Sequence, residues 1–311
     1  MSFLRFLEGI RTPFFDTVFA LITHLGEETV FLAFAIAVFW CINKREGYYI
    51  LITGLVGTVV NQALKLICKV PRPWKYPDFS AVESAIPEAT GYSFPSGHTQ
   101  NVTGTFGAVA RWSKRRAVRI VMIVLIALVA FSRMYLGVHT PYDVGFSLLF
   151  GAVLVFALYP LFKTEERFNK FMPYVVAASA LISLLHIVFV FLIPTGNIDI
   201  QNLESGRENA STLLGCTAGL IPVYFIDRKY LKFETEARWY AQLIKLTVGL
   251  ILVLLLKEGL KAPLGLIFDN AYVVRAVRYF TVVIFAGLVW PLTFKAFSRL
   301  KIKFLDNLFN K

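Results

Sequence analysis

Long apolar runs, separated by short charged segments, dominate the hydrophobic pattern of the chain. Nine of these runs are candidates for membrane-crossing helices, because the hydrocarbon core of a bilayer is spanned by about 20 apolar residues. They lie at residues 27–43, 48–66, 97–112, 119–136, 142–162, 172–194, 210–226, 241–257 and 277–295. The pattern predicts an all-α polytopic transmembrane helix bundle of about nine spans.

Composition agrees with a membrane protein and argues against a nucleic-acid partner. Hydrophobic residues make up 57% of the 311 residues, and the formal net charge is +12. The Lys and Arg residues fall in short clusters between the apolar runs, and no single face or tail collects them. This distribution is typical of membrane topology, so we expect the lipid bilayer and not nucleic acid as the surrounding partner.

The charge clusters also predict an orientation. If the spans alternate, one side of the membrane receives segments 44–47, 111–119, 163–170 and 227–238 and the tail from Lys295, which together hold 19 of the 32 Lys and Arg residues. By the positive-inside rule this side is cytoplasmic. We therefore expect a multi-pass protein of the cell membrane whose loop 67–95 faces outward.

Two further boundaries follow from the charged positions. Arg5, Glu8, Arg11 and Asp16 interrupt the first apolar stretch, which favours an interfacial amphipathic segment over a signal peptide. The charged stretch 163–170 divides the chain into residues 1–165, with five spans, and residues 166–311, with four spans to which the sequence assigns no role.

The cysteines indicate neither zinc nor a disulfide framework. Cys41, Cys68 and Cys216 lie far apart and form no CxxC or Cys/His cluster. We expect no metal and no cofactor.

Two cations follow the second predicted span. Lys65 is followed seven positions later by Arg72, and Pro71 and Pro73 end the helix there. This arrangement lets Arg72 fold back toward Lys65, so both charges can meet at one point. Taken alone, the pair is equally typical of interfacial anchors at a helix end.

The third predicted span begins at Pro95-Ser96-Gly97-His98. The first N–H groups of a helix have no internal partners and bind anions. The Gly97 backbone can approach a phosphate closely, Ser96 can donate its hydroxyl, and His98 carries a transferable proton. An ordinary helix cap beside an incidental histidine fits the same four residues.

The turn between the fourth and fifth predicted spans holds Ser132-Arg133 and, further on, His139 and Asp143. Pro141 suits the first position of a helix, which places Asp143 in its first turn on the same side as His139. A carboxylate that holds one ring nitrogen leaves the other free to attack an electrophile. A helix cap with a polar neighbour is the alternative.

The three segments together resemble the signature of the type 2 phosphatidic acid phosphatase superfamily, Lys-x6-Arg-Pro, Pro-Ser-Gly-His and Ser-Arg-x5-His-x3-Asp. Eleven specified positions match, each a roughly one-in-twenty event by composition. They are Lys65, Arg72, Pro73, Pro95, Ser96, Gly97, His98, Ser132, Arg133, His139 and Asp143. The resemblance covers about the first 165 residues, and the alternation of spans independently puts all three motifs on one membrane face.

The resemblance implies metal-independent hydrolysis through a phosphohistidine on His139. In this scheme Asp143 fixes the tautomer of His139, and His98 protonates the leaving oxygen and later activates water. The phosphate oxygens would be bound by Lys65, Arg72, Ser96, Gly97 and Arg133.

A lipid phosphate or lipid diphosphate is the expected substrate, because the site belongs to an integral membrane protein. The overall plan looks most like the undecaprenyl-diphosphate phosphatase branch, and phosphatidate and phosphatidylglycerol phosphate stay open as substrates. Two functions other than hydrolysis are also compatible with the sequence. One is a phosphotransferase, and the other is a lipid-binding or transport protein with an accessory phosphatase half. The sequence indicates no oligomeric state.

Overall fold

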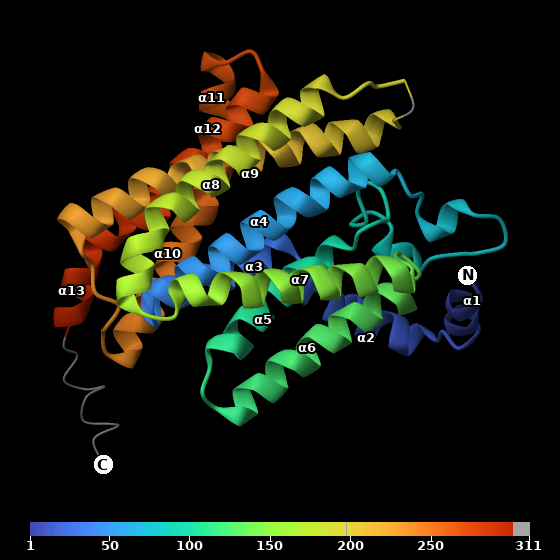
Figure 1. Ribbon diagram of the computed structural model, residues 1–311, viewed down its shortest axis with the longest axis horizontal. Helices are drawn as coiled ribbons and strands as arrows, with labels where there is room; N and C mark the ends of the chain where they lie inside the picture. Colours follow the sequence, from blue (N-terminus) through green and yellow to red (C-terminus); the bar gives the residue numbers. More distant parts are fainter. Residues whose placement is uncertain (197, 301–311) are drawn as a thin grey trace.

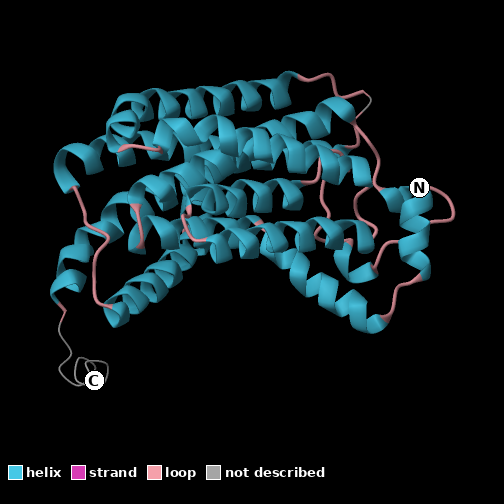
Figure 2. Cartoon of the chain, turned by 60° about the horizontal axis from the view of Figure 1, so that its bottom comes forward, coloured by secondary structure: helices cyan, strands magenta, loops and turns pink. Residues whose placement is uncertain are grey.

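The protein is a bundle of long helices in this computed structural model, which describes residues 1–196 and 198–300. Within those ranges every regular element is helical and no strand occurs. The helices lie roughly alongside one another, with most connecting loops gathered at the two ends of the bundle (Figures 1 and 2). The predicted all-α polytopic fold is confirmed.

The N-terminal segment forms two short helices and an apolar third one. α1 spans Ser2–Gly9, α2 spans Pro13–Thr23 and α3 spans Glu28–Cys41. Pro13 occupies the first turn of α2, and the Thr12 side chain caps it by accepting from the N–H of Phe15. α1 and α2 pack against the end of α6 and place the N-terminus at one end of the bundle (Figure 1).

Four helices form the next layer and carry all three sequence motifs. α4 spans Lys44–Cys68, α5 spans Gly97–Trp112, α6 spans Arg116–Tyr135 and α7 spans Pro141–Phe162. α5 packs against α4, α6 and α7 and is the central helix of this group. Consecutive helices run in opposite directions, so the end of α4, the start of α5, the end of α6 and the start of α7 meet at one end of the bundle (Figure 1).

The rest of the described chain adds a second group of helices. Its elements are α8 (Glu165–Leu192), α9 (Ile200–Ile226), α10 (Trp239–Gly259), α11 (Lys261–Ile267), α12 (Ala271–Ile284) and α13 (Phe294–Arg299). α9 packs against α8, α12 and α4, which joins this group to the first. Short 3-10 or π-helical turns lie at His24–Gly26, Pro73–Lys75, Glu83–Ala85, Asp227–Leu231, Phe285–Val289 and Trp290–Thr293.

The number of membrane-crossing helices differs slightly from the predicted nine. Seven helices of the described chain are long and apolar enough to cross a membrane, and the pair α2 and α3, bent by 51°, makes up to eight. The remaining predicted span is α5, which has only 16 residues. It is enclosed by other helices and buries polar side chains such as Gln100 and Thr103, so its surface need not be apolar. The chain is therefore a multi-pass membrane protein.

Two stretches between the predicted spans are partly helical. α9 begins at Ile200, where Asp199 caps it by accepting from the N–H of Asn202, although the apolar run starts only at residue 210. α11 lies between the predicted spans 241–257 and 277–295. Residues 301–311 of the basic tail counted as cytoplasmic lie outside the described residues.

One apolar core holds the two groups of helices together. Trp40 of α3 is fully buried and donates from Nε1 to the carbonyl oxygen of Ala286, 2.8 Å away, just beyond α12. The buried Lys245 of α10 donates to the carbonyl oxygen of Trp40 at 2.9 Å. Buried residues of α3, α4, α5, α7, α8, α9, α10 and α13 form one cluster, and partly buried residues of α12 pack against it, so the second group of helices completes the core of the first.

Candidate active site

A polar cavity of about 320 Å³ lies at the end of the bundle where α4, α5, α6 and α7 meet. Six of the eight residues singled out from the sequence line it, namely Lys65, Arg72, Gly97, His98, Arg133 and His139. The three motifs therefore converge on one cavity, as the alternation of spans predicts. The remaining two residues, Ser96 and Asp143, lie behind its wall.

The start of α7 fixes the position of His139. Thr140 is the N-cap, and its side chain accepts from the N–H of Asp143 while the Asp143 carboxylate accepts from the N–H of Thr140, which is a capping box. Pro141 occupies the first helical position, as predicted. His139 directly precedes this cap and is only 1% exposed. Its ring is thus held at the end of a rigid element.

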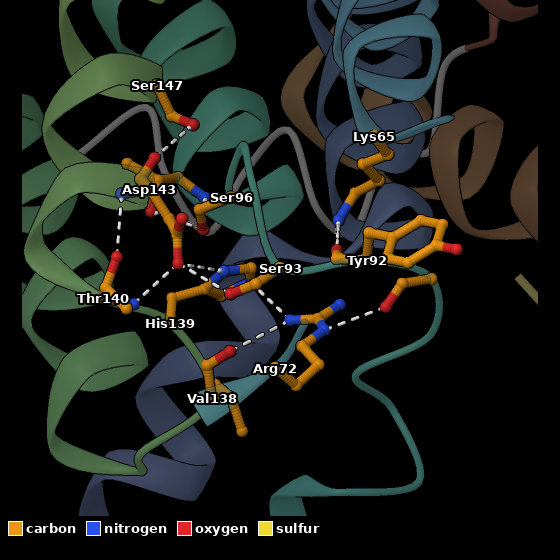
Figure 3. Close-up of polar contacts among 12 residues, drawn as sticks. Lys65, Arg72, Tyr92, Ser93, Ser96, Val138, His139, Thr140, Asp143 and Ser147 are labelled. Carbon is orange, nitrogen blue, oxygen red and sulfur yellow. Dashed lines mark hydrogen bonds and ion pairs between the residues drawn. The ribbon is translucent and has the colours of Figure 1, made fainter. Parts of the chain in front are cut away.

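Arg72 and His139 are directly hydrogen-bonded. The Nη1 of Arg72 lies 2.9 Å from the Nε2 of His139 (Figure 3). A guanidinium can only donate, so Nε2 is the acceptor and the proton of the neutral ring sits on Nδ1. The lone pair on Nε2 therefore points at Arg72, which lines the cavity together with His139.

Backbone carbonyls hold the guanidinium of Arg72 on its other sides. Its Nε donates to the oxygen of Gly91 at 3.0 Å, Nη1 to that of Val138 at 3.0 Å, and Nη2 to that of Thr90 at 2.6 Å. Gly91 has a φ of +71°, a conformation that favours glycine and that turns its carbonyl toward Arg72. The loop between α4 and α5 thus fixes this cation in the cavity wall.

Asp143 lies behind the ring of His139. Its Oδ2 accepts from the N–H of Thr140 and from the hydroxyl of Ser93, both at 2.7 Å, and lies 3.6 Å from the Nδ1 of His139 (Figure 3). The last distance is too long for a hydrogen bond, and the contact becomes an ion pair only when the ring is protonated. The carboxylate faces the ring nitrogen that carries the proton, which is the side that the sequence predicts.

The start of α5 brings Gly97 and His98 to the cavity. The Nε2 of His98 is buried and has no hydrogen-bond partner within the described ranges. Ser96 occupies a different position from the one expected. Its hydroxyl accepts from the N–H of Thr99 and bonds the Thr99 hydroxyl at 2.9 Å, and the residue is fully buried. In this structure Ser96 is the helix cap and does not line the cavity.

Two further cations come from the ends of α4 and α6. Lys65 is 5% exposed and donates its ammonium to the carbonyl oxygen of Tyr92 (Figure 3). Arg133 is 1% exposed and donates from Nη1 to the hydroxyl of Thr23 at 2.7 Å, while its Nε is left without a partner in the described chain. Three glutamates, Glu27, Glu28 and Glu88, also line the cavity but are at least partly exposed, whereas the three cations are buried. The buried part of the cavity therefore suits an anion.

The three cations change the protonation of His139. Burial and then the neighbouring Arg72, Arg133 and Lys65 lower the pKa of His139 well below its ordinary value. The imidazole is therefore neutral at neutral pH. A neutral imidazole with an available lone pair is the form in which histidine acts as a nucleophile.

Sequence reasoning missed several residues that support the site. Thr23 binds Arg133, and Ser93 binds Asp143. Both amide atoms of Asn61 are buried in the cavity wall with no partner in the described part of the chain. Gly26 packs so closely on His98 that a Cβ on Gly26 would lie 2.7 Å from the His98 Cβ. None of these positions belongs to a motif, although Asn61 stands out as an amide inside an apolar run.

An acidic group beside the cavity is also absent from the sequence prediction. His24, Glu27 and Glu88 bring three ligand atoms within 4.8 Å of one another, an arrangement that could hold a metal ion. His24 and Glu27 are hydrogen-bonded, and Glu27 and Glu88 line the cavity. The sequence suggested no such cluster because the three residues come from segments about 60 positions apart. Partly exposed acidic groups of this kind are common without a metal, so the group alone defines no metal site.

Comparison with protein families gives two matches. Residues 45–167 match the family model of the PAP2 superfamily, and residues 210–302 match that of the PAP2 superfamily phosphatase transmembrane extension. The first match contains all eleven signature positions. The second covers most of the helices whose role the sequence leaves open.

Individual relatives are phosphatases of several lipids. The chain is 31% identical to undecaprenyl-diphosphatase BcrC of Bacillus subtilis over 38% of this chain and 58% of that protein. It is 29% identical to phosphatidylglycerophosphatase B of the same organism over 52% of this chain and 82% of that protein. It is 25% identical to sphingosine-1-phosphate phosphatase 1 of Mus musculus over 65% of this chain and 46% of that protein. The chain thus spans about half the length of two of these relatives, and no solved structure matches it.

Proposed function

Since the chain belongs to the PAP2 superfamily, we propose that it is an integral membrane phosphatase that hydrolyses a lipid phosphate or lipid diphosphate. One observation supports this function most strongly. The Nε2 lone pair of His139 points at Arg72, and His139 lines one cavity together with three buried cations, Lys65, Arg72 and Arg133. A nucleophile inside a cationic cavity fits a phosphorylated substrate, because phosphoryl transfer depends mainly on positioning and on charge stabilisation.

In the first step the Nε2 of His139 attacks phosphorus and the bond to the leaving oxygen breaks. Arg72 donates to Nε2 in the free protein, so an entering phosphate replaces Nε2 as the acceptor of that donor. Asp143, on the far side of the ring, stabilises the positive charge that develops on the imidazole. His98 gives its proton to the leaving oxygen.

In the second step water breaks the bond between Nε2 and phosphorus. His98, now neutral, takes a proton from the water as it attacks, which releases inorganic phosphate and restores His139. The nearby cations disfavour a protonated His98 in the free protein, and the bound phosphate dianion favours it. Substrate binding thus supplies the proton donor that the first step needs.

The supporting residues take the following roles in this proposal. Lys65, Arg72, Arg133 and the Gly97 backbone bind the phosphate oxygens, and Ser96 holds the start of α5 in place as its cap. Residues 1–165 form the catalytic unit. None of the steps requires a metal ion, because three side-chain cations provide the positive charge that a divalent ion provides in other phosphatases.

We further propose that the protein lies in the cell membrane with its active site on the extracytoplasmic side. The end of α4 and the start of α5, which carry residues of the cavity, lie at the opposite end of the bundle from segments 44–47, 111–119 and 163–170, which are rich in Lys and Arg (Figure 1). A site on that side gives access to lipid phosphates of the outer leaflet.

The experiment that tests this function is phosphate release from a panel of lipids by purified protein in detergent. The panel contains undecaprenyl diphosphate, phosphatidylglycerol phosphate, phosphatidate and sphingosine 1-phosphate, each with EDTA present. We expect release from at least one lipid in EDTA and none from the His139→Ala variant. Release that needs added Mg²⁺ would contradict the metal-independent scheme and direct attention to His24, Glu27 and Glu88. Transfer of the phosphoryl group to an added alcohol, with no free phosphate, would identify a phosphotransferase instead.

A further inference from the structure

A second, larger cavity lies between the two groups of helices. Its volume is about 580 Å³, and α3, α4, α9, α10 and α12 all contribute to its wall. The wall is almost entirely apolar and includes Leu32, Ile36, Leu220 and Val283. Cavities of this size and character bind apolar ligands. The helices α9, α10 and α12 belong to the region that matches the transmembrane extension.

The apolar cavity adjoins the phosphate site. Glu28, the first residue of α3, lines both cavities. Thr29 and Lys257 lie at this same end of the apolar cavity, whereas the rest is lined by Gly287 and by mainly apolar side chains, among them Tyr48 and Tyr279. Together the two cavities match an amphiphilic ligand, because the cavity at His139 is polar and the cavity deeper in the bundle is apolar.

The depth of the apolar cavity corresponds to one leaflet of a bilayer. Glu28 and Phe39 both line it and lie 11 positions apart on α3. At 1.5 Å per residue the cavity runs along about 16 Å of the helix. Half of a hydrocarbon core is about 15 Å thick. A lipid chain in this cavity would thus run at the depth at which it lies in the surrounding leaflet.

The α10 side of the cavity carries exposed apolar side chains. Leu254 of α10 lines the cavity and is 53% exposed, and the next residue, Leu255, is 63% exposed. A chain can therefore enter from the membrane without crossing water, while its headgroup moves into the polar cavity.

We propose that this cavity binds the hydrocarbon chain of the lipid whose phosphate occupies the site at His139. α9, α10 and α12 then form the tail-binding wall of the enzyme, which gives the C-terminal helices a role in substrate binding. The inference rests on the proposed phosphatase function. It identifies the substrate class as a phosphate attached to an extended hydrocarbon chain, and it locates the selection of that chain between α3 and the C-terminal helices.

The test narrows the cavity and compares two substrates. Leu254→Trp places an indole in the cavity, whereas Leu255→Trp puts the same side chain at a neighbouring position that is 63% exposed and does not line it. Ala33→Trp and Ala37→Trp form a second matched pair on α3, in which only Ala33 lines the cavity. For each protein, kcat/KM is measured with a lipid phosphate of 16 or more chain carbons and with a phosphate of about four carbons, and the ratio of the two values is taken.

We expect the ratio of long-chain to short-chain kcat/KM to fall at least tenfold in Leu254→Trp and Ala33→Trp and to stay within twofold in both controls. An unchanged ratio in both cavity variants, with short-chain hydrolysis intact, would overturn the tail assignment and leave the phosphatase function standing. A wild-type protein that hydrolyses neither substrate would instead overturn the function itself. A general loss of both activities in one cavity variant is resolved by the other, which lies on a different helix.

Discussion

Arg72 and His139 are hydrogen-bonded in the wall of the polar cavity, with the Nη1 of Arg72 2.9 Å from the Nε2 of His139. Because the guanidinium cannot accept, this bond sets the tautomer of the imidazole. It also marks the position of the substrate, since a phosphate that Arg72 binds lies directly in front of the attacking nitrogen. One bond between residues 67 positions apart thus aligns the nucleophile with the anion-binding group.

Arg72→Lys is expected to lower kcat/KM by about 100-fold or more, the size of effect found when one donor to a developing oxyanion is removed. The guanidinium bonds three carbonyls and His139 at once, which an ammonium on a flexible stem cannot reproduce. The measurement is steady-state hydrolysis in detergent. Arg119→Lys is the matched control, because Arg119 lies at the other end of the bundle, where it donates to the Ser113 carbonyl oxygen. Equal activity of the two variants would remove Arg72 from the phosphate site.

Gly97→Ala is expected to raise KM by about tenfold, with kcat changed less, and to leave stability unchanged or slightly improved. A Cβ at this position would meet no protein atom closer than 3.9 Å, and Gly97 lines the cavity, so an added methyl takes space from the ligand and not from the protein. Gly145→Ala on α7 is the control, because a Cβ there has no neighbour within 4 Å. A wild-type KM in Gly97→Ala would show that the phosphate does not approach this backbone.

We expect kcat/KM to fall on the acid side only below about pH 6.5, the ordinary pKa of histidine. Burial and the three cations lower the pKa of His139, so the nucleophile stays neutral at pH 6.5 and is lost only as the pH falls through the lower, folded-state value. The measurement is kcat/KM against pH, corrected for the second ionisation of the substrate phosphate near 6. Lys65→Met removes one positive charge that repels a protonated His139, so it should shift the acid-side fall of kcat/KM to higher pH.

The lowered pKa of His139 also makes the stability of the folded protein depend on pH. A histidine whose folded-state pKa is below its unfolded value binds fewer protons when folded, so its contribution opposes folding as the pH falls below about 6.5. His139→Gln should therefore flatten the loss of melting temperature on acidification in this window. Two results would argue against a neutral His139. One is an acid limb of wild-type activity above pH 6.5, and the other is an unchanged loss of melting temperature on acidification in His139→Gln.

Sidedness is tested with two single cysteines in a background lacking Cys41, Cys68 and Cys216. Lys75 and Lys114 are both exposed, Lys75 near the cavity and Lys114 between α5 and α6 at the opposite end. Lys75→Cys should react with a membrane-impermeant maleimide in intact cells, and Lys114→Cys only after lysis. The reverse pattern would place His139 in the cytoplasm and make a lipid phosphate of the inner leaflet the substrate.

Much of this architecture could be predicted from the sequence because its signals are local. Apolar runs mark the helices, and the prolines at positions 73 and 141 mark where elements end or begin. The alternation of spans then brings Lys65, His98 and His139 to one end of the bundle. No three-dimensional information is needed for that step.

The parts that could not be predicted depend on contacts between distant segments. Arg72 is held by carbonyls of Thr90, Gly91 and Val138, and backbone groups leave no trace in side-chain patterns. α5 was expected as a span, yet its burial among other helices allows it to be short and polar. The apolar cavity is a property of five helices packed together, so no single run of the sequence reveals it.

The most direct test of the central claim is to trap the phosphoryl group on the protein. A ³²P-labelled aryl phosphate, whose leaving group needs little protonation, is mixed with His98→Gln, in which water activation is impaired. The reaction is quenched in alkali, where a phosphohistidine survives, and the labelled peptide is located by mass spectrometry. The account predicts close to one label per chain, on His139, and no label in His139→Ala. Label on another residue, or turnover by His139→Ala at the wild-type rate, would contradict it.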